Sequence, residues 1–363
     1  MFLYTRCRRS LPLVFEIYAR SFDQIYFPLR FVYRSFAKTT IFAVEILVHT
    51  SRAFYRVSFN YKGLITPVFT PFNNDSARTL NLSIIPQYAD HLAKEKVTGV
   101  LVNGTTGEGP SMTTSERKLV AEAWANAVKT TKQHLMIQVG GTSLPDVLEL
   151  AKHAENIKAD SILCLPELYF SPSTSEQLKD YLKLVSSAAP NTPLLYYHIP
   201  SLTNVDVHMA QFLESVNEEE IPTFVGIKFT SPNLDEGAQA FHVNNNKFAV
   251  FLGNDQLITA ACALGMHSFI TTGSNMFSEI VLETLAAGLA GNVMKGRETQ
   301  QHLTNAVTNV SKYGTWVETM KPAMTLLTSI NPGPPRAPLK PLSVQTVASM
   351  AKDLQNLGFN VKL

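Results

Sequence analysis

Several short polar stretches carry side chains that could bind or transform a small organic acid. The first is the stretch 103–109, where glycines permit tight turns and the hydroxyls of Thr105 and Thr106 precede a helix-like segment. Backbone N–H groups and hydroxyls in such a loop can receive a carboxylate. Because glycine, threonine and asparagine also form ordinary turns, this stretch alone does not establish a binding site.

A lysine lies inside an apolar run at residues 223–229. Lys228 is the only charged residue of that run. A charged ammonium is costly in a buried strand, whereas a neutral amine there can attack a carbonyl carbon and form a Schiff base. The alternative is a lysine that lies near the end of the strand and extends its head into water.

Two adjacent tyrosines end the apolar run 193–199. Successive side chains of a strand point to opposite faces, so either Tyr196 or Tyr197 must face the interior. A phenol beside an amine can move protons, although a tyrosine that only fills the core is the alternative. His198 has no acidic partner nearby in the sequence, and we interpret it as structural.

A further polar stretch, 253–256, follows the run 248–252. Its polar groups could bind substrate hydroxyls. Asp255 or Asn254 could instead cap the helix that follows.

Eight apolar runs alternate with helix-like segments after residue 62. Runs apolar on both faces that alternate with helices indicate parallel strands. Eight such units without a GxGxxG turn favour a (β/α)8 TIM barrel over a doubly wound sheet, and a barrel gathers its chemistry at the carboxyl ends of its strands. The expected strands are residues 63–69, 99–103, 135–139, 161–165, 193–199, 223–229, 248–252 and 268–272.

Helical patterns continue beyond the eighth run. They cover residues 277–289, 293–313, 317–329 and 344–357, with a proline-rich stop at 331–336. We therefore predict one barrel domain over residues 62–363, with a C-terminal helical appendage that begins at about residue 276.

Composition excludes several classes of protein. With 363 residues, 45% of them hydrophobic and 17% charged, the chain is globular, and a net charge of +2 gives no support for nucleic-acid binding. Cys7, Cys164 and Cys262 lie too far apart for a zinc motif or a disulfide framework, so we expect no metal site. No apolar run is long enough to span a membrane.

The first 61 residues differ from the rest. Residues 1–62 hold ten Lys and Arg residues against three acidic ones. Such a segment is either an unstructured extension or an organelle transit peptide. We expect a cytoplasmic protein, or a mitochondrial one if the segment is a transit peptide.

In this order, the motifs resemble the class I aldolases of the N-acetylneuraminate lyase and dihydrodipicolinate synthase type. The resemblance extends from about Lys62 to Lys340. It rests on the stretches 63–72 (GLITPVFTPF), 103–109 (NGTTGEG), 196–203 (YYHIPSLT), 226–230 (GIKFT) and 333–336 (GPPR).

The resemblance implies a role for each matching residue. Lys228 matches the lysine that forms a Schiff base with pyruvate, and Tyr197 matches the tyrosine that shuttles protons. Thr105 and Thr106 match the pair that holds the keto acid carboxylate, and Tyr169 matches an aromatic residue that many members offer to a neighbouring subunit. The other expected substrate-binding residues are Thr230, Gly253, Asp255, Gln256 and Thr272.

The resemblance also bears on the reaction. Leu202 stands where the synthase branch has an arginine, which favours a lyase. Gln256 and Thr272 replace a glutamate and a serine of the lyase pattern. The expected reaction is reversible cleavage of N-acetylneuraminate to pyruvate and N-acetylmannosamine, without a cofactor.

Two alternatives stay open. One is an aldolase for a shorter 2-keto acid, of the 4-hydroxy-2-oxoglutarate or 2-keto-3-deoxy sugar acid type. The other is a catalytically silent sugar-acid binding protein. By analogy with the family we expect a homotetramer whose partners are its small-molecule substrates, with neither a nucleic acid nor a membrane among them.

Overall fold

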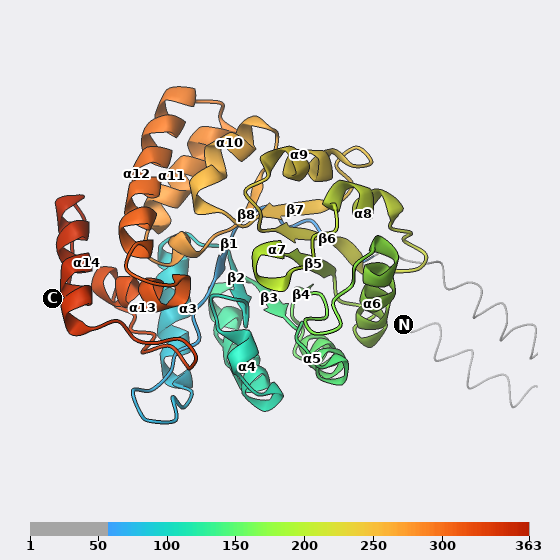
Figure 1. Cartoon of the computed structure of the whole chain (residues 1–363), viewed down its shortest axis with the longest axis horizontal. Helices are drawn as coiled ribbons and strands as arrows, with labels where there is room; N and C mark the ends of the chain where they lie inside the picture. Colours follow the sequence, from blue (N-terminus) through green and yellow to red (C-terminus); the bar gives the residue numbers. More distant parts are fainter. Residues whose placement is uncertain (1–56, 363) are drawn as a thin grey trace, which may run out of the picture. The chain divides into compact units, whose positions relative to one another are not determined.

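The strands form a closed parallel barrel. The computed structural model describes residues 57–362. Within them each strand pairs in parallel with the next along the chain, and β8 pairs with β1 to close the ring (Figure 1). The predicted barrel is confirmed, with strands Gly63–Pro67 (β1), Gly99–Val102 (β2), His134–Gln138 (β3), Ser161–Cys164 (β4), Leu194–His198 (β5), Phe224–Phe229 (β6), Ala249–Leu252 (β7) and Ser268–Ile270 (β8).

Helices surround the barrel and follow its strands. Short 3-10 segments at Leu82–Ile84 (η1), Gly109–Ser111 (η2), Asp255–Leu257 (η3) and Thr272–Asn275 (η4) lie in the connections. The helices are Ile85–Lys94 (α3), Thr114–Thr131 (α4), Leu144–Asn156 (α5), Ser175–Ala188 (α6), Pro200–Thr203 (α7), Met209–Ser215 (α8), Leu234–His242 (α9), Ile258–Ala263 (α10) and Ser278–Leu289 (α11).

The predicted C-terminal appendage is also confirmed. After α11 the chain forms Val293–Ser311 (α12), Trp316–Leu327 (α13) and Val344–Asn356 (α14). These helices lie together on one side of the barrel, at the left of Figure 1. The proline-rich stretch 331–336 is free of helix and strand, as its composition predicts.

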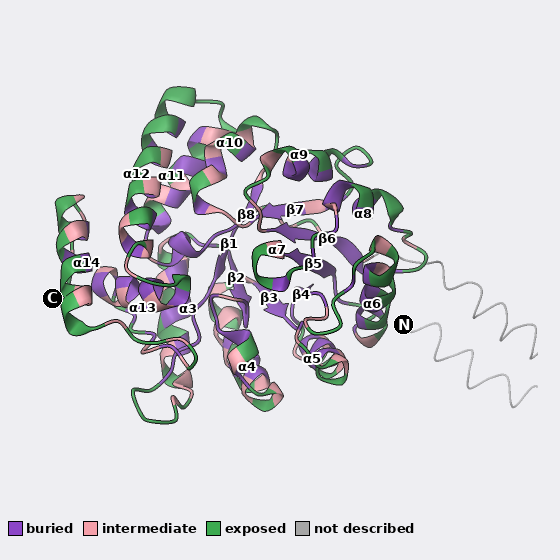
Figure 2. Cartoon of the chain, in the orientation of Figure 1, coloured by how far each residue is buried: buried purple, intermediate pink, exposed green. Residues whose placement is uncertain are grey.

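The strands are buried on both faces, which explains their nearly continuous apolar sequences. One cluster fills the barrel interior and includes Leu101, Met136, Phe251 and Tyr197. A larger cluster lies between strands and helices and includes Tyr196. Figure 2 shows the buried strands inside helices that are exposed on their outer faces.

The residues before β1 pack at the amino-terminal end of the barrel. The ring of Phe59 lies 5.7 Å from that of His134, and the ring of Tyr61 lies 4.5 Å from His134. The hydroxyl of Tyr61 donates to the Leu64 carbonyl at 2.7 Å. Of the expected extension 1–61, residues 57–61 thus lie against the barrel, and residues 1–56 fall outside the described part.

This packing predicts where the chain can be shortened. Deleting residues 1–61 removes Phe59 and Tyr61, whereas deleting 1–56 keeps both. Because both rings are partly buried against the barrel interior, we expect the shorter protein to lose on the order of 2 kcal/mol of unfolding free energy relative to the longer one. Urea unfolding of the two truncated proteins measures the difference, and equal midpoints would show that the two rings add nothing.

No helix among residues 57–362 is both long and apolar enough to cross a membrane.

Candidate active site

Lys228 and Tyr197 lie side by side inside the barrel. They are register partners on β6 and β5, and Lys228 is only 5% exposed. Its Nζ atom lies 4.1 Å from the centre of the Tyr197 ring. The structure therefore places the predicted amine and phenol together, where burial restricts access to water.

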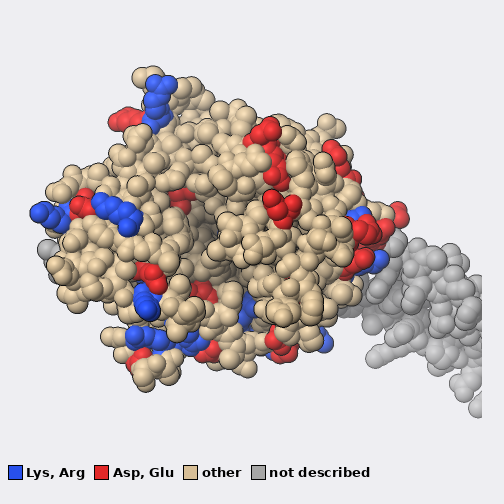
Figure 3. Space-filling model, in the orientation of Figure 1, with Lys and Arg blue, Asp and Glu red and all other residues tan. Residues whose placement is uncertain are grey.

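Threonine hydroxyls converge on this pair from the neighbouring loops. The hydroxyl of Thr105 is hydrogen-bonded to that of Tyr197 at 3.1 Å. The hydroxyl of Thr106 is bonded to that of Thr272, after β8, at 2.9 Å. Three of the predicted carboxylate- and substrate-binding residues thus reach one site. The molecular surface is hollowed near the centre of the face shown in Figure 3.

The loop that carries Thr105 and Thr106 has an unusual backbone. Asn103 and Glu108 adopt left-handed conformations, with φ of 61° and 54°. The side chain of Asn103 donates to the Arg117 carbonyl at 2.9 Å, which holds the beginning of the loop. At Gly109 a Cβ atom would lie 2.0 Å from the Asn103 carbonyl oxygen, so this position requires glycine.

Thr230 and Gly253 lie next to Lys228. A Cβ atom at Gly253 would lie 2.2 Å from the Thr230 hydroxyl and 3.3 Å from Cε of Lys228, so glycine keeps this space open. The buried hydroxyl oxygen of Thr230 has no hydrogen-bond partner among the described residues. Buried hydroxyls normally have a partner, so this oxygen can bond a ligand.

Asp255 and Gln256 take different positions. The carboxylate of Asp255 is buried and accepts the Gly273 N–H at 3.1 Å, which ties η3 to η4. The exposed Gln256 side chain donates to the Thr308 hydroxyl of α12 at 3.2 Å. Asn254 is the N-cap of η3, so the capping alternative is correct for Asn254.

Burial raises the pKa of the Asp255 carboxyl to about 6, although the Gly273 N–H favours the ionised form. The folded protein therefore binds this proton more tightly than the unfolded chain, whose aspartate pKa is about 3.9. Between these two pKa values the free energy of unfolding falls as pH rises.

We expect Asp255→Asn to remove this pH dependence while keeping an oxygen that accepts the Gly273 N–H. From pH 5 to pH 7 the unmodified protein should lose about 1 kcal/mol of unfolding free energy relative to the variant. Urea unfolding of both proteins at the two pH values tests this. An identical pH dependence would mean that Asp255 has an ordinary pKa.

Three other residues considered in the sequence make no side-chain hydrogen bond to this cluster among the described residues. Tyr169 is 76% exposed, and its ring packs edge-on against Phe170 at 5.0 Å between centres. Leu202 on α7 is 63% exposed. His198 is buried and stacks on Phe229 at 5.2 Å, in keeping with its structural interpretation.

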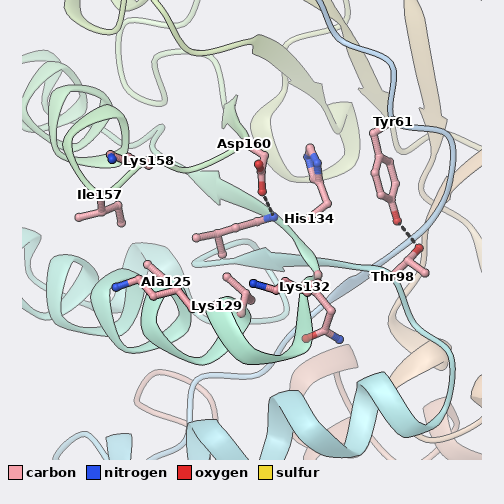
Figure 4. Close-up of a pocket in the computed structure, with 12 residues that line it drawn as sticks. Tyr61, Thr98, Ala125, Lys129, Lys132, His134, Ile157, Lys158 and Asp160 are labelled. Atoms are coloured by element: carbon pink, nitrogen blue, oxygen red, sulfur yellow. Dashed lines mark hydrogen bonds between the residues drawn. The ribbon is translucent and has the colours of Figure 1, made fainter.

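A cavity lies at the opposite, amino-terminal end of the strands. Its volume is about 640 Å³, and its lining includes His134 and Asp160 (Figure 4). Lys129, Lys132 and Lys158 also line it and lie at the carboxyl ends of α4 and α5, where a positive charge offsets the helix dipole. These lysines have a structural explanation, so the cavity is not our candidate site.

No group of three or more His, Cys, Asp or Glu side chains among residues 57–362 could hold a metal ion.

Two residues of the appendage contact the site and were not predicted. Trp316 at the start of α13 donates its ring N–H to the Thr272 hydroxyl at 3.1 Å. Lys321, also on α13, forms a buried ion pair with Glu108 of the threonine loop. Both lie more than 40 residues from Thr272 in the sequence, and no local sequence pattern indicates these contacts.

The fold and this geometry can be compared with known proteins. The model of the dihydrodipicolinate synthetase family matches residues 60–357. An N-acetylneuraminate lyase of Danio rerio is 36% identical over 81% of this chain and 95% of the relative, and one of Homo sapiens is 35% identical over 82% and 93%. The structure of Proteus mirabilis N-acetylneuraminate lyase superposes with a TM-score of 0.78, at 31% identity over 83% of this chain and all of that one.

Proposed function

Because the chain belongs to the dihydrodipicolinate synthetase family, we propose that it is a class I aldolase that cleaves N-acetylneuraminate to pyruvate and N-acetylmannosamine. The observation that carries this proposal is the buried Lys228 amine beside the Tyr197 phenol, with the Thr105 hydroxyl bonded to that phenol. The N-acetylneuraminate lyases among its relatives support the choice of substrate.

In the proposed reaction, Nζ of Lys228 attacks the keto carbon of the open-chain sugar acid. Loss of water gives a protonated imine between enzyme and substrate. This imine withdraws electrons, so the bond between C3 and C4 can break without a metal ion or an organic cofactor. The electron pair of that bond forms the enamine of pyruvate on Lys228.

Tyr197 moves the proton. Its hydroxyl oxygen removes the proton from the C4 hydroxyl as the C3–C4 bond breaks, which releases N-acetylmannosamine as an aldehyde. The same group then protonates C3 of the enamine, and water hydrolyses the resulting imine to free pyruvate. The bond between Tyr197 and Thr105 supports this role, because it fixes the phenol whose ring lies under the amine.

The threonine loop would hold the carboxylate. Thr105 and Thr106 offer hydroxyls and backbone N–H groups beside the reacting amine, and hydrogen bonds to a charged group are the stronger kind. Thr272 supports Thr106 through their shared hydrogen bond. The sugar tail would extend past the remaining predicted residues, which are Thr230, Gly253, Asp255 and Gln256.

A panel of 2-keto acids tests the choice of substrate. Pyruvate release should be fastest from N-acetylneuraminate, and slower from 4-hydroxy-2-oxoglutarate and 2-keto-3-deoxygluconate. Because Leu202 provides no positive charge for a second carboxylate, aspartate semialdehyde with pyruvate should give no dihydrodipicolinate. If the enzyme preferred a four- to six-carbon acid, the shorter-acid aldolase would be the correct assignment. If it cleaved none of the acids, the protein would be the catalytically silent sugar-acid binding protein.

We also propose a homotetramer in which Tyr169 reaches the active site of a neighbouring subunit. The exposed Tyr169 and Phe170 rings support this, since a pair of exposed aromatics marks an interaction surface. Light scattering measures the subunit number.

For the compartment we propose the cytoplasm, which fits the free thiols of Cys164 and Cys262. If residues 1–61 are a transit peptide, the compartment is mitochondrial. A reporter fused to those residues distinguishes the two.

A further inference from the structure

A buried ion pair joins the C-terminal appendage to the threonine loop. Nζ of Lys321 on α13 lies 2.6 Å from Oε1 of Glu108, and the two side chains are 0% and 1% exposed. Glu108 follows Thr105 and Thr106 by only two to three residues. The pair therefore connects a helix outside the barrel with the loop proposed to bind the carboxylate.

Lys321 holds the loop at a second point as well. Its Nζ atom also donates to the Thr70 carbonyl at 3.0 Å. The Thr70 hydroxyl in turn donates to the Gly107 carbonyl at 2.6 Å. The other carboxylate oxygen of Glu108 accepts the Arg336 N–H at 2.7 Å. Gly107 and Glu108, the two residues directly after Thr106, are thus fixed from outside the loop.

Stability alone does not explain this arrangement. Two charges lose their hydration when they are buried, and an ion pair of this kind often stabilises a fold no more than apolar residues of the same volume. The ion pair does hold the Glu108 side chain in one place while its backbone is in the left-handed conformation, with a φ of 54°. Left-handed conformations of residues other than glycine persist only where the surroundings enforce them.

We propose that Lys321 is a positioning residue for the aldolase reaction. By holding Glu108 and Thr70, it sets the loop so that Thr106 meets the carboxylate of the keto acid. This inference rests on the proposed function, because it assumes that Thr105 and Thr106 bind that carboxylate. Lys321 itself touches neither the substrate nor Lys228 in this account.

The test compares Lys321→Met with the double variant Glu108→Gln/Lys321→Met. Methionine keeps most of the volume, and glutamine removes the buried charge that the single change would leave unpaired. We expect KM for N-acetylneuraminate to rise about tenfold in both variants, with kcat within about threefold, as for a loss of uniform binding. Thermal unfolding measures whether each variant is folded, and we expect the double variant to fold because it leaves no buried charge unpaired.

A matched control is Lys312→Met. Lys312 directly follows α12 as its C-cap and pairs with Asp353 at 2.6 Å, but it is 45% exposed. Its replacement should leave KM unchanged. An equal rise of KM in this control would mean that any lost ion pair of the appendage has the same effect, and the inference would be wrong.

Coupling to Thr106 separates positioning from a general structural effect. If Lys321 acts through the loop, adding Lys321→Met and Glu108→Gln to Thr106→Val should raise KM by less than twofold beyond Thr106→Val alone. A further tenfold rise would overturn the inference. Failure of the proposed function is seen separately, because the unmodified enzyme would then not cleave N-acetylneuraminate.

Discussion

Replacing Lys228 with methionine is expected to abolish turnover, with kcat lowered by more than about ten-thousandfold. Removing a covalent nucleophile has effects of this size because no other group can form the intermediate. Methionine fills a similar volume, and Lys228 is buried inside the barrel, so the variant should fold. A coupled assay of pyruvate release measures the loss.

Lys129→Met provides the control for this variant. Lys129 lines the cavity at the opposite end of the barrel and is exposed. Its replacement should leave kcat unchanged. Activity of Lys228→Met above about one hundredth of the unmodified enzyme would exclude Lys228 as the nucleophile.

Tyr197→Phe should lower kcat by about 10² to 10⁴, the usual contribution of a positioned acid or base. The phenylalanine ring can keep its contact with Lys228, and the variant loses only the hydroxyl and its bond to Thr105. Lys228 should still form the imine with pyruvate in this variant. The loss of activity would therefore report proton transfer and not formation of the imine. Steady-state kinetics with N-acetylneuraminate measure kcat.

The neighbouring tyrosine gives a matched control. Tyr196 lies on the outward face of β5, and its buried hydroxyl has no hydrogen-bond partner among the described residues. Tyr196→Phe makes the same chemical change one residue away and should leave kcat unchanged. If Tyr196→Phe and Tyr197→Phe had equal effects, the loss would come from packing and not from proton transfer.

The number and order of the strands could be predicted from the sequence because every strand is buried on both faces. The run 223–229 is apolar apart from Thr223 and Lys228, and the structure places β6 at Phe224–Phe229. Lys228 stood out for the same reason, as a single charge in an apolar run. The local sequence was sufficient to predict the strands because each strand of the barrel is buried on both faces and is therefore apolar along most of its length.

The local sequence alone could not predict which of the two tyrosine side chains points into the barrel. Tyr196 and Tyr197 are the same type of residue at adjacent positions of one apolar run. Only the register of β5 against β6 pairs Tyr197 with Lys228. The resemblance to the aldolases selected Tyr197, and the structure places it inside the barrel.

Contacts made by the appendage lay beyond sequence reasoning. The position of α12 decides that Gln256 bonds Thr308, and the position of α13 decides that Lys321 reaches Glu108. A lysine in a helix normally faces water, so Lys321 carried no local signal of its buried partner. Such pairs depend on how helices pack against the barrel, which hydrophobic periodicity does not specify.

The central claim is that Lys228 forms an imine with the keto acid. Incubating the full-length enzyme with pyruvate and borohydride reduces any imine to a stable secondary amine, and peptide mass spectrometry locates it. We expect one irreversible adduct, on the peptide that contains Lys228, with loss of activity in proportion to labelling. An adduct on another lysine, or full inactivation without any adduct, would contradict it.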